Sequence, residues 1–249
     1  MQKLAAFVHG KHFEGQTSSA TFHEIYEILQ SLCLPKNTSF LDLGCGNGSF
    51  TRKISKKFGF KTIGVDLSQQ LVNQANQDAL LEKISGFCKF YKDDFVTLST
   101  LREHEKFGGL ISIGSLYWNQ PLKQTLSTWE KHVEDQGYLI IFLNLIIKDL
   151  TNDEQKRIGK TKFIYKSELE EILFNGFKSY IWEDRTSTYI SWLKKWCEGM
   201  NRFQKEIYQE MGSENALLLF LRFQTYLKLA LQKKVLREVI VMKKRHAND

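Results

Sequence analysis

The stretch LDLGCGNGSF, residues 41–50, decides the fold, because it places three glycines at alternate positions directly after an apolar run. Glycine weakens the interior of a strand or helix, since its backbone loses the most conformational entropy on folding. Gly44, Gly46 and Gly48 therefore indicate a sharp turn that a ligand approaches closely. A strand that passes through such a turn into a helix is the ligand-binding turn of doubly wound α/β folds.

Two familiar forms of this turn do not fit. A P-loop needs Gly-Lys followed by Ser or Thr, and no such triplet follows Gly48. A dinucleotide-binding turn has the spacing GxGxxG, whereas residues 44–48 read GxGxG. The turn therefore predicts close packing against an uncharged or zwitterionic ligand.

Asp66 ends the next predicted strand, KTIGVDLS at 61–68. In doubly wound folds an acidic residue about 20 residues after the turn accepts hydrogen bonds from ribose hydroxyls. The alternative is that Asp66 caps the helix after Ser68, which is itself an expected N-cap. A glycine turn and a strand-end carboxylate together favour a nucleoside-binding site.

Apolar patterning predicts strands that alternate with helices along the chain. We expect strands at 38–44, 61–68, 88–94, 110–115, 137–144, 178–184 and 235–245. Helices are expected at 20–33, 49–59, 68–80, 97–104, 122–135 and 165–177, with a longer helical stretch at 187–234. This alternation predicts an α/β fold with a doubly wound, mostly parallel, seven-stranded sheet.

Composition narrows the class of protein. The 249 residues are 42% hydrophobic and carry a net charge of +7, with lysines spread along the chain. We interpret this charge as solvated surface, which makes nucleic acid a disfavoured partner. The four cysteines form no CxxC pair, so neither a metal site nor a disulfide framework is expected.

Hydropathy predicts a cytoplasmic protein. The most apolar window, GYLIIFLNLII at 137–147, is too short to span a membrane. The first residues lack the layout of a signal peptide. We therefore expect no membrane partner.

Five motifs in order resemble the class I S-adenosylmethionine-dependent methyltransferases. They are FLDLGCGNGSFT, IGVDLS, YKDDF, ISIGSLYWN and GYLII, and they cover roughly residues 38–145. The resemblance implies a Rossmann-like fold and S-adenosylmethionine as cofactor. One departure is Gly108, where the family usually has an acidic residue that is mostly structural.

The resemblance implies a set of cofactor-binding residues. These are Asp42, Gly44, Cys45, Gly46, Gly48, Asp66, Leu67, Asp94, Phe95, Ile113 and Gly114. The glycines would lie beneath the methionine part, Asp42 would hold its amino group, and Asp66 would hold the ribose.

The adenine and sulfonium ends are implied in the same way. Leu67 would cover one adenine face, and Asp94 would accept from the adenine amino group with Phe95 beside it. Ile113 and Gly114 would contribute backbone contacts near the sulfonium.

Several of these positions have structural alternatives. Asp93 competes with Asp94, because a shift of one residue exchanges them. Asp42 ends an apolar strand, where it requires a partner, and both a ligand and backbone amides qualify.

Aromatic residues near the predicted site also have two interpretations. Tyr117 and Trp118 are the catalytic candidates at the substrate mouth, since ring faces attract a sulfonium cation, and core packing is the alternative. The stripe Tyr189, Trp192 and Trp196 is predicted to be the apolar face of a helix covering the end of the sheet.

Two kinds of nucleic-acid methyltransferase use sequence motifs that can be looked for in this chain. The tip of the fourth strand reads SLYWNQP at 115–121, which differs from the loop used for exocyclic base nitrogens. Cytosine C5 methylation uses a cysteine after proline, and neither Pro35 nor Pro121 precedes one. Both chemistries are disfavoured.

The expected architecture favours a small acceptor. We expect one methyltransferase domain, 1–249, with a lid at 1–36, a cofactor-binding core at 37–150 and a substrate-side half at 151–249. The lid and the insertion at 187–234 would enclose a pocket. N-methylation is slightly favoured over O- or C-methylation, because no general base stands out.

Other readings stay open. They are a tRNA or rRNA methyltransferase, a non-catalytic S-adenosylmethionine-binding protein and a different doubly wound nucleotide enzyme. A monomer or homodimer is expected.

Overall fold

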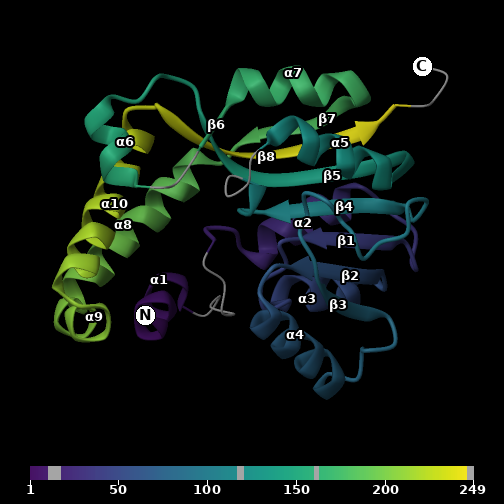
Figure 1. Cartoon of the computed structure of the whole chain (residues 1–249), viewed down its shortest axis with the longest axis horizontal. Coiled ribbons are helices and arrows are strands. Elements are labelled where there is room, and N and C mark those ends of the chain that lie inside the picture. The colour runs from purple at the N-terminus through teal and green to yellow at the C-terminus, as the bar shows by residue number, and fades with distance from the viewer. Residues whose placement is uncertain (11–17, 117–120, 160–162, 246–249) are drawn as a thin grey trace.

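The chain folds around one mixed sheet in a computed structural model, which describes residues 1–10, 18–116, 121–159 and 163–245 (Figure 1). The strands are β1 (Ser39–Leu43), β2 (Lys61–Asp66), β3 (Cys88–Lys92), β4 (Phe107–Ile113), β5 (Val133–Ile146), β6 (Ile164–Tyr165), β7 (Phe177–Asp184) and β8 (Val235–Lys244). The sheet order is β3-β2-β1-β4-β5-β8-β7, with the short β6 paired to β5. Among these strands β8 runs opposite to the rest, and it pairs antiparallel with both β5 and β7.

Helices cover both faces of this sheet (Figure 1). They are α1 (Gln2–His9), α2 (Phe22–Ser31), α3 (Ser49–Phe58), α4 (Gln69–Leu81), α5 (Leu122–His132), α6 (Asn152–Ile158), α7 (Lys166–Gly176), α8 (Thr186–Arg202), α9 (Gln204–Met211) and α10 (Ser213–Leu231). The predicted doubly wound α/β fold with a helical insertion before the last strand is therefore confirmed.

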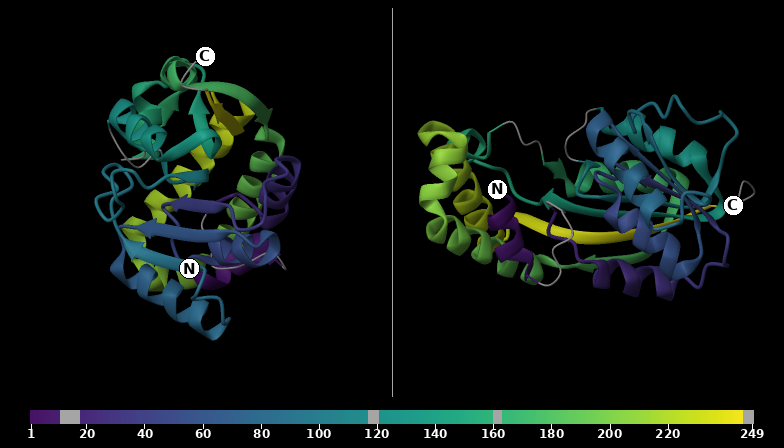
Figure 2. Two further views of the ribbon diagram at one scale, coloured as in Figure 1. Left: turned by 90° about the vertical axis from the view of Figure 1, so that its right-hand side faces the viewer. Right: turned by 90° about the horizontal axis from the view of Figure 1, so that it is seen from below.

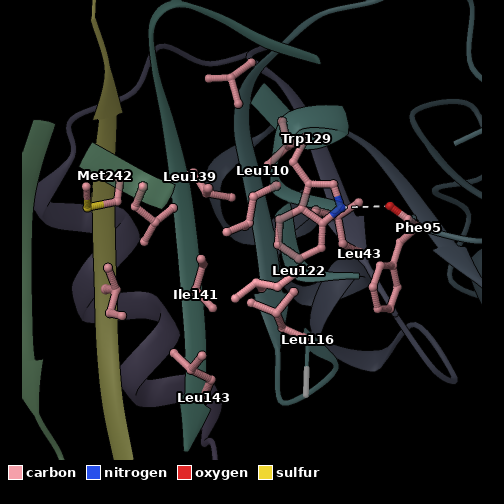
Figure 3. Packing of buried hydrophobic residues seen from close by; sticks show 14 of the residues in the cluster. Leu43, Phe95, Leu110, Leu116, Leu122, Trp129, Leu139, Ile141, Leu143 and Met242 are labelled. Atoms are coloured by element: carbon pink, nitrogen blue, oxygen red, sulfur yellow. Dashed lines mark hydrogen bonds between the residues drawn. The ribbon is translucent and has the colours of Figure 1, made fainter. Parts of the chain in front are cut away.

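The two cores follow the alternation of side chains along the central strands. Leu139, Ile141 and Leu143 of β5 face the cluster that contains Trp129 of α5. Tyr138, Ile140 and Phe142 face the opposite cluster, which contains residues of α2 and α3. Because both faces are buried, β5 reads as a continuous apolar run. Figure 3 shows the first cluster, in which the Trp129 indole donates to the Phe95 carbonyl at 2.8 Å.

The glycines before the fourth strand have a packing reason. A Cβ at Gly108 would lie 2.7 Å from Thr38 Cγ2, and one at Gly109 would lie 2.2 Å from the Phe40 ring. Side chains are therefore excluded where β4 passes β1, which accounts for the absence of an acidic residue at 108.

The prediction of a helix at 97–104 is wrong. Residues 93–101 form turns around the buried Asp93 carboxylate, which accepts from the amide and hydroxyl groups of both Ser99 and Thr100. Side chains that bond the nearby backbone compete with helix formation in this way. The helix α6 and the strand β6 were not predicted.

A group of helices stands beyond one end of the sheet (Figures 1 and 2). Trp196 and Met200 of α8 pack with Leu4 and Val8 of α1 and with Ala216 of α10. The predicted apolar face of the insertion therefore buries its side chains against other helices, and this group lies beside the carboxyl ends of β4 and β5.

A buried ion pair ties α2 to β8. The guanidinium of Arg237 donates to both carboxylate oxygens of Glu24, at 2.8 and 3.3 Å. Arg237 is 2% exposed and Glu24 is 9% exposed. Glu24 also closes the capping box of α2 with Thr21, so the pair fixes the start of that helix.

Replacement of Glu24 tests this pair. Glu24→Gln leaves the buried guanidinium of Arg237 without a countercharge and should lower the free energy of unfolding by ~3–5 kcal/mol in urea denaturation. Glu27→Gln is the control, because Glu27 lies on the same helix, is about half exposed and pairs with His23. Equal losses for the two variants would contradict the assigned role of the pair.

Candidate functional site

The glycine turn joins β1 to α3 with three left-handed residues. The φ angles of Gly44, Gly46 and Gly48 are 79°, 57° and 70°, a region that favours glycine. A Cβ at Gly44 would lie 2.5 Å from Ser115 Cβ, and one at Gly48 would lie 2.5 Å from the Phe90 ring. A Cβ at Gly46 would meet nothing within 4 Å. At Gly44 and Gly48, neighbouring side chains occupy the place that a Cβ would take, whereas the same place at Gly46 is open space.

That space is a cavity of about 240 Å³, which we call the turn cavity. Its lining residues are Ser18, Asp42, Gly44, Cys45, Gly46, Asn47, Ser49, Phe50, Leu71 and Ile113. Five of the eleven predicted cofactor-binding residues are in this set. It lies beside the point where β1 has β2 on one side and β4 on the other, which is where ligands bind in doubly wound sheets.

Asp66 holds the turn through its carboxylate. Oδ2 accepts from the Gly46 amide and Oδ1 accepts from the Ser68 amide, both at 2.9 Å. Each oxygen retains a second lone pair that can accept from a ligand hydroxyl. Ser68 is the N-cap of α4, as predicted. Asp66 is therefore part of the turn and of the start of α4, although it does not line the turn cavity itself.

Asp42 is a buried carboxylate on the wall of the turn cavity. Thr51 Oγ1 donates to its Oδ2 at 2.6 Å, and no donor to Oδ1 is found among the described residues. Burial raises the pKa of Asp42 to about 7, the Thr51 hydrogen bond lowers it, and the charge of Asp66 raises it. A cationic ligand group would relieve this cost.

Asp93 and Asp94 are adjacent in sequence but have different environments. Burial raises the pKa of Asp93, but the hydrogen bonds from Thr100, Ser99 and the Asp94 amide outweigh this effect and hold the pKa below its usual range. Asp93 is thus committed to its own loop. Asp94 is half-buried, and its Oδ1 accepts from the Val96 amide at 2.9 Å.

The other predicted residues of the adenine end lie outside the turn cavity. The Leu67 side chain is 55% exposed, next to Asp66. The Phe95 ring is 6% exposed and packs edge-on against Trp129. Phe95 therefore lies in the core, as a member of the buried cluster that contains Trp129 (Figure 3).

Cys45 lines the turn cavity without reactive character. Burial raises the pKa of its thiol well above the ordinary value, and the charges of Asp42 and Asp66 raise it further. The neutral thiol is a poor nucleophile. No group of three or more His, Cys, Asp or Glu that could hold a metal ion occurs in the part of the chain that the structure describes.

A second cavity of about 220 Å³ adjoins the first, and we call it the aromatic cavity. Its lining residues are Ser18, Ser19, Ala20, Ile113, Gly114, Phe142, Leu143, Asn144, Phe163, Tyr189, Trp192, Arg222, Phe223, Tyr226 and Arg237. Ser18 and Ile113 border both cavities. The end of β4 therefore stands between two spaces, with Gly114 on the side of the aromatic cavity.

Sequence reasoning missed several of these positions. Arg222 is the only charged residue in ALLLFLRFQTYL, residues 216–227, and a single charge in an apolar helix is a signal of function that could have been used. Asn144 and Arg237 belong to predicted strands, and nothing in the pattern of those strands singles them out. Tyr117 and Trp118, the catalytic candidates, lie outside the described residues.

Within the described ranges, no helix combines the length and the apolar character needed to cross a bilayer.

The raised pKa of Asp42 predicts a pH dependence of stability. A carboxyl whose folded pKa lies above its unfolded value stabilises the fold at low pH, and this contribution is lost as the pH rises toward 7. Between pH 5 and 8 the wild type should therefore lose more free energy of unfolding than Asp42→Asn, measured by urea denaturation at each pH. Identical pH profiles would contradict the buried, ionisable state assigned to Asp42.

The comparisons with known proteins agree with this geometry. The family model described as a methyltransferase domain matches residues 34–211, more than half of the chain. Phosphoethanolamine N-methyltransferase of Plasmodium falciparum is 32% identical over 97 residues, 38% of this chain and 34% of that protein. Malonyl-[acyl-carrier protein] O-methyltransferase of Priestia megaterium is 26% identical over 119 residues, 47% and 41% of the two chains.

The chain thus spans less than half the length of these curated relatives. Among solved structures, phosphoethanolamine N-methyltransferase 2 of Haemonchus contortus in complex with S-adenosyl-L-methionine has a TM-score of 0.79 at 18% identity, covering 98% of this chain and 56% of that one. That likeness shows the fold. On the match of its family model, the chain belongs to the methyltransferase-domain family, among the class I S-adenosylmethionine-dependent methyltransferases.

Proposed function

We propose that the protein binds S-adenosylmethionine at the turn cavity and transfers its methyl group to a small molecule in the aromatic cavity, with an amine nitrogen as the favoured acceptor atom. The observation that carries the proposal is that the two cavities lie next to each other and share the lining residues Ser18 and Ile113. Bound there, the cofactor supplies an electrophilic methyl group on a sulfonium.

The donor would be held by the residues of the turn. The open space over Gly46 suits its methionine part, and the Asp42 carboxylate, with Oδ1 lacking a donor in the described chain, suits the ammonium group. Asp66 is assigned the ribose hydroxyls. Leu67 and Asp94 are assigned the adenine, because both are accessible at the end of the neighbouring strands.

The protein would act mainly by positioning. Methyl transfer requires the acceptor atom to approach the methyl carbon in line, and holding both in place supplies most of the rate enhancement. Ser18 and Ile113 line both cavities and Gly114 lines the aromatic cavity, so this approach would occur beside them. The aromatic walls exclude water, which strengthens the attraction between the sulfonium and the nucleophile.

The lining of the aromatic cavity favours an amine. Its described lining residues include no carboxylate, imidazole or lysine. A hydroxyl or a carbon acid needs a general base at the moment of attack, whereas an unprotonated amine does not. The curated relative named as a phosphoethanolamine N-methyltransferase is consistent with this choice.

The size of the cavity favours a small acceptor. About 220 Å³ lies below the roughly 300–1,000 Å³ typical of pockets for drug-sized ligands. A tRNA or rRNA substrate, the main rival suggested by the net charge of +7, would need a wider opening. A cytoplasmic location, a single domain over 1–249, and a monomer or homodimer remain predictions from the sequence.

Labelled S-adenosylmethionine tests the proposed activity. The chain is incubated with small amines, the matching alcohols, and bulk tRNA and rRNA, and transfer is followed by mass spectrometry with excess S-adenosylhomocysteine as inhibited control. We expect transfer to an amine, with kcat/KM rising about tenfold per pH unit below the pKa of that amine.

Other outcomes would redirect the proposal. Transfer to RNA alone would establish the rival. Tight cofactor binding without transfer to any acceptor would identify a non-catalytic binding protein. Transfer to alcohols at the expense of amines would overturn the preference for nitrogen.

A further inference from the structure

The aromatic cavity contains two guanidinium groups in different states. Arg237 is neutralised by the two-point contact with Glu24. Arg222, from α10, has no hydrogen bond, ion pair or aromatic stacking contact to its guanidinium among the residues that the structure describes, and its Nε is fully buried. The second cation of the cavity therefore lacks a protein partner within that part of the chain.

Arg222 is partly buried as a residue, but its Nε is a buried donor without a partner in the described chain, and such a donor is costly. Native structures pair such groups, and the exceptions point to a ligand or ion that the protein binds. Gly159 stands next to Arg222, where an added Cβ would lie 3.1 Å from Nη2. Because Gly159 has φ of 69° and no side chain, the guanidinium keeps its space at the end of α6.

The rest of the lining accentuates the positive charge. Its described residues comprise no acid, and most of the wall is apolar or aromatic, with Asn144 and Tyr226 as polar neighbours. Tyr226 follows Arg222 by one helical turn, so both side chains lie on the same face of α10. The low dielectric of such a wall strengthens the attraction of Arg222 for an anion.

We propose that the methyl acceptor carries an anionic group, a carboxylate or a phosphate, which Arg222 binds at the far side of the aromatic cavity from the glycine turn. The planar guanidinium fork matches either anion. The inference rests on the proposed function, because the nucleophilic end of the methyl acceptor would then lie at the part of the aromatic cavity lined by Ile113 and Gly114. Arg222 is thus a specificity-determining residue.

The two walls then have opposite charge. Asp42 borders the turn cavity and Arg222 borders the aromatic cavity. A molecule with an amine at one end and an anion at the other enters in one orientation, since the reverse orientation would leave Arg222 facing the amine and without a countercharge.

Four proteins test this inference: the wild type, Arg222→Met, Arg222→Lys and Lys228→Met. Lys228 is the matched control, because it removes the same charge from an exposed position of the same helix. Each protein, saturated with S-adenosylhomocysteine, is titrated calorimetrically with inorganic phosphate and with acetate. Each is also assayed for methyl transfer with the pairs phosphoethanolamine and ethanolamine, and glycine and glycinamide.

We expect the wild type to bind either phosphate or acetate. It should then prefer phosphoethanolamine over ethanolamine if it binds phosphate, or glycine over glycinamide if it binds acetate. Arg222→Met should weaken the binding of that anion and raise the KM of the charged acceptor, each by about ten- to a hundredfold. The KM of the neutral acceptor should be nearly unchanged. Arg222→Lys should restore part of the loss, and Lys228→Met should match the wild type.

Equal effects of Arg222→Met on charged and neutral acceptors would overturn the inference, because they would indicate a structural role. So would absence of anion binding in the wild type. Anion binding that depends on Arg222 without any methyl transfer would support the inference while contradicting the proposed function. Transfer to neutral acceptors alone would support the function and overturn the inference.

Discussion

The hydrogen bond from the Gly46 amide to Asp66 is the constraint on which the site depends. It fixes the glycine turn of one strand to the carboxylate of its neighbour, at 2.9 Å. The turn can take this course because residues 44, 46 and 48 have left-handed φ angles. The amide nitrogens of Gly44 and Cys45 are both bonded to the Val65 carbonyl, so the turn is anchored to β2 at several points.

This rigid turn faces a wall built from distant parts of the chain. The helices α8 and α10 and the segment Ser18–Ala20 close the space beyond the carboxyl ends of β4 and β5. The Glu24–Arg237 pair connects α2, which follows that segment, to β8. One ion pair therefore helps to stabilise the wall and leaves Arg222 as the cation without a counterpart in the described lining. Acidic groups on the donor side and a basic group on the acceptor side divide the site by charge.

Much of the fold could be predicted from the sequence because local patterns and tertiary packing agree. The strands at β1, β2 and β4, the glycine turn and the Ser68 cap each carry a strong local signal. The predicted helix at 97–104 failed, since the hydrogen bonds of Asp93 to Ser99 and Thr100 depend on a fixed loop that periodicity does not detect. The separate duties of Gly44, Gly46 and Gly48 could not be predicted, because only their three-dimensional neighbours distinguish packing from open space. Arg237 was missed because an arginine on a predicted strand resembles a surface residue, whereas Arg222 did carry a signal, its isolated charge in an apolar helix.

The most direct test of the central claim is calorimetric titration of S-adenosylhomocysteine into the wild type, Gly46→Val and Gly86→Ala. Both glycines border open space, where a Cβ would meet nothing within 4 Å, but Gly86 lies in the loop between α4 and β3, outside the lining of the turn cavity. If the space over Gly46 holds the cofactor, the wild type and Gly86→Ala bind equally and Gly46→Val, with its fold intact by circular dichroism, does not bind. Normal binding by Gly46→Val would contradict the account.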